Sequence, residues 1–97
     1  GLGASSEYLH FIITGPVGPY FKGGFNPVSV YISDSIRRAV IGGIGEAKTG
    51  GNYAASLYMS EKVAKQGYTQ VLWLDAIAGK YIEEVGAMNI CFVYEGS

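Results

Sequence analysis

Glycine and proline divide this chain into short segments, and that division limits what it can fold into. Fifteen of the 97 residues are glycine, roughly twice the average share of 7%, and they are clustered rather than periodic. Residues 15–27 hold all three prolines and four glycines, and residues 42–51 hold five more glycines. Since both residue types weaken the interior of helices and strands, these stretches are predicted to be an irregular connector and a loop.

The segments between these breaks carry recognisable patterns. Short apolar runs rich in β-branched and aromatic residues predict strands at 8–14, 28–32, 70–75 and 90–94. A helix is predicted over 52–66, with Asn52 as its N-cap and Gly67 as its left-handed stop. The expected class is therefore mixed α and β.

Charge, hydropathy and cysteine content restrict the partners and the compartment. Seven Lys and Arg against eight Asp and Glu give a net charge of −1, so no nucleic-acid partner is expected. The apolar runs are far shorter than the ~20 residues that span a bilayer, so no membrane association is expected either. The single cysteine, Cys91, forms no internal disulfide, which favours a reducing, cytoplasmic location.

Lys48 has the most informative surroundings, because glycines and a threonine flank it just before the predicted helix. One interpretation is a nucleotide-binding loop. Residues 42–49 fit the pattern G-x-x-x-x-G-K-T except at Ala47, and Asp75 ends an apolar segment as a magnesium-binding aspartate would. The missing glycine stands where the tight phosphate cradle needs it.

The other interpretation is a lysine that forms an imine with pyridoxal 5'-phosphate. Such a site needs an amine, a carboxylate to keep the pyridine nitrogen protonated, and a donor to the phenolic oxygen of the ring. Lys48, Glu84 and Tyr53 supply these three types, although each would, taken alone, more often be a surface charge or a packed tyrosine.

Four separated motifs together resemble the branched-chain amino acid aminotransferases, which are class IV pyridoxal phosphate enzymes. They are GPVGPYF at 15–21, FNPVS at 25–29, GEAKTGGNY at 45–53 and YIEEVGAMN at 81–89. The resemblance runs along nearly the whole chain, in the order and at about the spacing of the family. The family's chains are several times longer, so an internal fragment is implied.

The resemblance implies a fold class and a domain organisation. The chain would be an α+β fragment of a fold-type IV aminotransferase. Residues 1–20 would end the small N-terminal domain, residues 21–27 would form the interdomain connector, and residues 28–97 would begin the large cofactor-binding domain.

It also implies roles for individual residues. Lys48 would hold the cofactor as a Schiff base and carry the proton between the substrate α-carbon and the cofactor. Glu84 would pair with the pyridinium nitrogen, and Tyr53 would donate to the phenolic oxygen. Tyr20 would lie in the substrate pocket, and Arg38 would lie near the cofactor, although a solvated charge is the alternative for this arginine.

Ala87 departs from the pattern of the family. Many members have a threonine there, whose hydroxyl or amide faces the cofactor and substrate, so only the backbone N–H of Ala87 is left to make that contact. His10, Asp75 and Cys91 match no catalytic position of the family.

The function implied is the transfer of the amino group of Leu, Ile or Val to 2-oxoglutarate by a homodimeric enzyme of amino-acid biosynthesis. Enzymes of the same fold that act on D-amino acids or on aminodeoxychorismate remain alternatives. In the family, the groups that hold the cofactor phosphate lie outside this stretch. The 97 residues alone are therefore expected to be catalytically inert.

Overall fold

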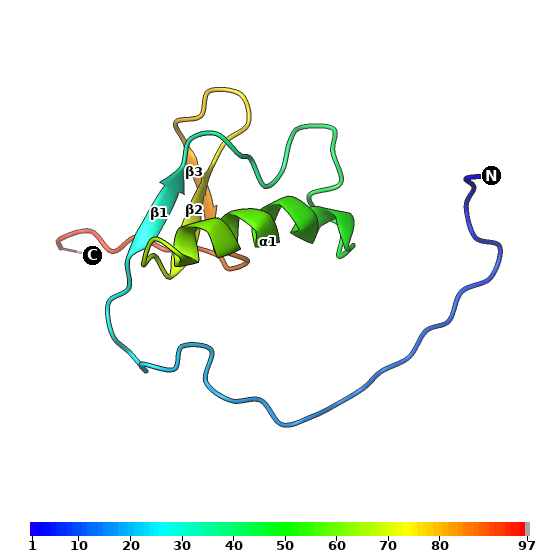
Figure 1. Ribbon diagram of the computed structural model, residues 1–97, viewed down its shortest axis with the longest axis horizontal. Helices are drawn as coiled ribbons and strands as arrows, with labels where there is room; N and C mark the ends of the chain where they lie inside the picture. The colour runs from blue at the N-terminus through cyan, green and yellow to red at the C-terminus, as the bar shows by residue number, and fades with distance from the viewer. Residues whose placement is uncertain (97) are drawn as a thin grey trace.

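The computed structural model describes residues 1–96, and its ordered centre is a small sheet with a helix on one face (Figure 1). The elements in chain order are β1 (Val30–Ser33), α1 (Gly51–Ala64), β2 (Gln70–Leu74) and β3 (Ile82–Val85). Both helix and strand are present, so the predicted mixed class is confirmed.

The sheet has the order β1-β2-β3 and combines both kinds of pairing. β1 and β2 run parallel and are joined through α1, as parallel neighbours require a crossover. β2 and β3 form an antiparallel hairpin, in which Trp73 stands opposite Glu84. The pairing shifts between Trp73 and Leu74, so a bulge separates this pair from the end of the hairpin.

The core is formed where α1 crosses β2. Met59 and Val63 lie one helical turn apart and pack against Val71 and Trp73, which are two residues apart and therefore on the same face of the strand. All four side chains are at most 1% exposed. Tyr31 of β1 packs against this cluster from the side. The helix therefore covers the sheet face on which Trp73, and with it Glu84, stands.

The helix was predicted within two residues at each end, but its start works differently. The N-cap is Gly50, and no side chain caps the helix, so the prediction of Asn52 as N-cap is wrong. Asn52 lies inside the first turn, and its amide bonds to the preceding loop instead. Gly67 has φ of +90°, which confirms the predicted left-handed stop.

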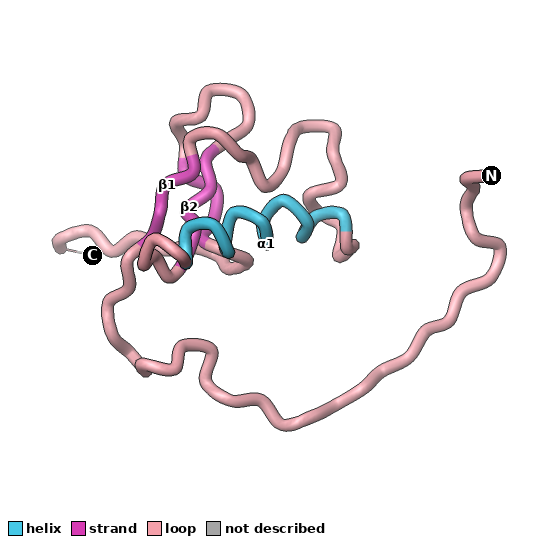
Figure 2. The backbone as a smooth tube through the Cα atoms, viewed as in Figure 1, coloured by secondary structure: helices cyan, strands magenta, loops and turns pink. Residues whose placement is uncertain are grey.

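Two predicted strands are absent from the described residues. Residues 8–14 and 90–94 form neither strand nor helix, and residues 1–29 form a long loop that leads into β1 (Figure 2). Their apolar composition suits a strand, but a strand also needs a neighbour to bond with, and neither segment lies in the sheet. The predictions at 28–32 and 70–75 are confirmed, each with slightly shifted ends. Within residues 1–96, none of the helical structure has the length and apolar character needed to cross a membrane.

Candidate active site

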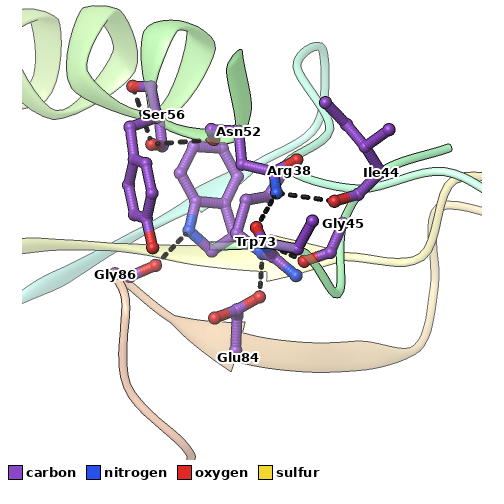
Figure 3. A network of polar contacts seen from close by, with 10 residues as sticks. Arg38, Ile44, Gly45, Asn52, Ser56, Trp73, Glu84 and Gly86 are labelled. Carbon is purple, nitrogen blue, oxygen red and sulfur yellow. Dashed lines mark hydrogen bonds and ion pairs between the residues drawn. The ribbon is translucent and has the colours of Figure 1, made fainter. Parts of the chain in front are cut away.

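Arg38 and Glu84 form an ion pair beneath the first turns of the helix (Figure 3). Glu84 comes from β3, and Arg38 comes from the turns that follow β1. The hairpin register sets Glu84 beside Trp73, on the face that α1 covers, so both charged side chains are only about one-fifth exposed. A partly buried pair of this kind is screened less by salt than a surface pair.

The glycine-rich loop before α1 is held by side chains on both sides. The amide nitrogen of Asn52 donates to the carbonyl oxygens of Ile44, at 2.6 Å, and of Ala47. A terminal guanidinium nitrogen of Arg38 approaches the carbonyl oxygen of Gly45 at 3.5 Å. Backbone bonds within the loop, such as Thr49 to Ala47 at 2.9 Å, add to this. The loop that carries Lys48 is thereby tied to α1 and to the ion pair.

Lys48 leaves this loop with an exposed side chain. Its ammonium nitrogen lies 4.9 Å from the centre of the Tyr53 ring, a distance at which the cation is attracted by the ring face. Tyr53 is the fifth residue after Lys48, and the helix begins between them, which turns the Tyr53 ring back toward the lysine. Lys48 and Tyr53, which share the motif at 45–53, are therefore in contact in space.

Two cavities connect the remaining predicted residues. One, of about 70 Å³, is lined by Arg38, Tyr53, Glu84 and Ala87 among others. A larger one, of about 260 Å³, shares Tyr53 and Ala87 with it and is also lined by Tyr20. Five of the six predicted site residues thus border these cavities, and Lys48 joins them through the ring of Tyr53.

A third cavity lies on the loop side of the ion pair. It measures about 480 Å³, and Arg38 and Glu84 line it together with Gly43, Gly45 and Glu46. The two charged residues therefore border this cavity as well as the small one. A group placed in either space could reach both charges.

Asp75, the candidate magnesium ligand, has a different role. Its carboxylate accepts backbone N–H bonds from Ile77, Ala78, Lys80 and Tyr81, at 2.6 to 3.2 Å, and so organises the β2–β3 hairpin loop. The bonds from Tyr81, Ala78 and Lys80 hold the pKa of Asp75 well below its usual range.

The nucleotide-loop interpretation is not favoured for a second reason. A phosphate-binding loop of that kind follows directly on a strand. Here residues 34–50, which lead from β1 to α1, contain turns and bends but no strand.

Sequence reasoning missed two residues of this region. Asn52 was assigned to the helix cap, whereas it is 92% buried and bonds to the loop. Trp73 is fully buried, and its indole N–H donates to the carbonyl oxygen of Gly86 at 2.9 Å, which fixes the backbone just before Ala87. A buried asparagine has no distinctive sequence signal, and the place of Trp73 opposite Glu84 depends on the hairpin register, which only the structure gives.

Comparison with known proteins supports the resemblance directly. The branched-chain-amino-acid transaminase 1 of Bacillus subtilis is 54% identical over 97 residues, which is 99% of this chain and 27% of that protein. The branched-chain-amino-acid aminotransferases of Mycolicibacterium smegmatis and Mycobacterium tuberculosis are each 52% identical, over 97% and 96% of this chain. The resemblance to the branched-chain aminotransferases is confirmed.

The extent of the match matters as much as the identity. The chain spans about a quarter of the length of the curated relatives it matches. No protein-family model matches it. The similarity to branched-chain aminotransferases therefore covers nearly all of this chain but only one stretch of each relative.

Proposed function

We propose that this chain belongs to an enzyme that transfers the amino group of branched-chain L-amino acids to 2-oxoglutarate, with pyridoxal phosphate bound through Lys48. The observation that carries the proposal is the identity of more than half of the residues with proteins named as branched-chain aminotransferases, over 96% or more of this chain. The cluster formed by Arg38, Glu84 and Tyr53 with the Lys48 loop supplies the polar groups that such a site needs.

The residues present fit this cofactor in type and charge. An exposed amine can reach a carbonyl carbon, a carboxylate suits a pyridinium nitrogen, and a guanidinium and a phenol suit anionic oxygens. The space of about 480 Å³ beside Arg38 and Glu84 is open to solvent, and Lys48 and Tyr53 are not among its lining residues, so the fit rests on the residue types and charges.

When bound, pyridoxal phosphate supplies an electron sink for the carbanion that forms when the substrate α-proton leaves. In the proposal, the amine of Lys48 binds the cofactor covalently and, when substrate takes that position, moves the α-proton. Glu84 would keep a proton on the pyridine nitrogen, and Arg38, its ion-pair partner, would hold Glu84 in place. The Tyr53 hydroxyl would donate a hydrogen bond to the phenolic oxygen.

Tyr20 and Ala87 belong to the substrate side of the proposal. They line the same cavity of about 260 Å³, which also has Leu57 in its wall. Its wall combines these aromatic and aliphatic groups with polar side chains, and a branched aliphatic side chain would lie against the apolar part; the polar residues are Ser56, Ser60, Thr69 and Gln70. Because an apolar pocket separates substrates that differ by one methylene by only about 1–3 kcal/mol, Leu, Ile and Val are all expected to be used as substrates, within a modest factor of one another.

The domain organisation, the homodimer and the cytoplasmic location belong to the same proposal. Residues 1–20 would end a small domain, residues 21–27 would connect, and residues 28–97 would begin the cofactor domain; Ser97 lies outside the described residues. The absence of helix and strand from residues 1–29 supports a boundary in this part of the chain.

The test uses the full-length protein, with L-leucine and 2-oxoglutarate as substrates and Lys48→Arg as the variant. Lys48→Arg keeps the charge but cannot form the covalent link, so turnover of L-leucine is expected to disappear. Lys62→Arg, an exposed lysine in the last turn of α1, is the matched control and should keep wild-type turnover. Comparable turnover of D-alanine by the wild type, or an active Lys48→Arg variant, would refute the proposal.

A further inference from the structure

Resting on the proposed function, we infer that Asn52 is a positioning residue, which sets the place of the Lys48 amine by holding the two carbonyl groups that turn the preceding loop. Asn52 stands four residues after Lys48 and is 92% buried, although its side chain is polar. A buried amide costs free energy unless its donors are used. Here the donors are used on the loop and not on the helix.

The two bonds of Asn52 fall on either side of the loop's turn. Its nitrogen donates to the carbonyl oxygen of Ile44, at 2.6 Å, and to that of Ala47, the residue directly before Lys48. The same two loop residues are joined by a backbone bond, in which the Ala47 N–H donates to the Ile44 carbonyl at 2.9 Å. One side chain therefore fixes the backbone immediately before the reactive lysine relative to the first turn of α1.

The carbonyl of Gly45, which lies between these two in the sequence, has its own side-chain contact. Arg38 approaches the Gly45 oxygen at 3.5 Å while it pairs with Glu84 (Figure 3). Asn52 and the Arg38–Glu84 pair thus contact neighbouring carbonyl groups of one loop. The consequence is a continuous chain of contacts from Glu84, proposed at the pyridine nitrogen, to Lys48, proposed at the aldehyde carbon.

The close packing around two glycines of the loop supports a single loop conformation. A side chain at Gly45 would meet the Cβ of Ala39 at 2.6 Å, and one at Gly43 would meet Val40 at 2.9 Å. The glycines let the loop pack closely against residues 39 and 40. The hydrogen bonds of Asn52 connect the loop to α1. The loop is therefore held both by residues 39 and 40 and by the helix.

The first measurement is amide hydrogen exchange on loop 44–49 in the full-length protein without added cofactor. Asn52→Ala removes both donors, and Asn52→Asp removes them with little change of size. Both variants are expected to speed exchange of the loop amides by about tenfold, while the amides of β2 keep their protection. Asn26→Ala is the matched control, since the Asn26 amide also bonds a backbone carbonyl, that of Gly23, but outside this region.

The second measurement separates positioning from folding. Pyridoxal phosphate is added, the protein is reduced with borohydride, and the label on Lys48 is followed over time by mass spectrometry. Asn52→Ala and Asn52→Asp are expected to label at least about tenfold more slowly than wild type and Asn26→Ala. A variant is taken as folded when its circular dichroism spectrum matches that of wild type. If Asn52→Ala does not fold, the comparison is made with Asn52→Asp.

The outcomes distinguish the inference from the function on which it rests. A wild-type protein that takes no label on Lys48 overturns the proposed function and the inference with it. A wild-type protein that is labelled, beside folded Asn52 variants with the same labelling rate or the same loop exchange, overturns the inference alone.

Discussion

The ion pair between Arg38 and Glu84 gives the sharpest quantitative prediction about this fold. We expect a double-mutant cycle with Arg38→Gln and Glu84→Gln to report a favourable coupling free energy. Both side chains are about one-fifth exposed, 21% and 20%. Exposed pairs contribute about 0.2–1 kcal/mol, whereas breaking a fully buried pair costs about 3–5 kcal/mol, so a coupling of about 1–2 kcal/mol is expected here.

The single variants should differ in their total cost. Glu84→Gln keeps an oxygen that can accept a bond from Arg38, although one that is no longer charge-assisted. Arg38→Gln also loses the approach to the Gly45 carbonyl, so it should destabilise the chain more than Glu84→Gln does. Both effects act on the free energy of unfolding.

Trp73 provides the assay. It is the one tryptophan of the sequence, is fully buried and stands opposite Glu84 in the hairpin, so its fluorescence reports unfolding of this region in urea. Arg37→Gln, combined with Glu84→Gln in a second cycle, is the matched control and should show no coupling. The Arg37 guanidinium donates to the Ser33 carbonyl at 3.1 Å and not to Glu84. A coupling between Arg38 and Glu84 no larger than about 0.5 kcal/mol, the level at which independent sites add, would refute the reasoning.

Two further predictions concern the hairpin. Because the N–H groups of its loop depress the pKa of Asp75 below the unfolded value of 3.8, the carboxylate stabilises the fold above that value and the contribution is lost as pH falls through the folded pKa. Urea titrations between pH 7 and pH 2 should show a steeper acid loss for wild type than for Asp75→Asn, and parallel curves would contradict this. Gly86→Ala should cost about 1–3 kcal/mol in the same assay, since φ is +61° and the new Cβ would meet the Gln70 side chain. Gly50→Ala, with φ of −57° and open space around it, should cost nothing, and equal effects at the two glycines would be the contrary result.

The sequence predicted those parts of the fold whose signals are local. The helix ends beside glycines, and the strand at 70–74 is an apolar run between polar and turn residues, so both could be placed to within two residues. The strands expected at 8–14 and 90–94 were wrong because composition indicates a preference for extended backbone but not the partner that satisfies its N–H and C=O groups. Pairing is a property of the tertiary structure.

In the candidate site, too, local spacing predicted some contacts, whereas others depend on the tertiary structure. The contact between Lys48 and Tyr53 follows from their spacing across a helix start and was anticipated as two groups of one site. The ion pair of Arg38 with Glu84 depends on the register of the hairpin, and the clamp formed by Asn52 depends on how the loop folds back. Neither could be derived from spacing, although the resemblance had placed Arg38 and Glu84 near one cofactor.

The central claim is that Lys48 binds pyridoxal phosphate, and the site of covalent labelling tests it most directly. The full-length protein is purified, reduced with borohydride, digested, and mapped by mass spectrometry. The account predicts the reduced cofactor on the peptide that contains Lys48, with no label on Lys22, Lys62, Lys65 or Lys80. A label on another lysine, or none on Lys48 when cofactor is in excess, would contradict it.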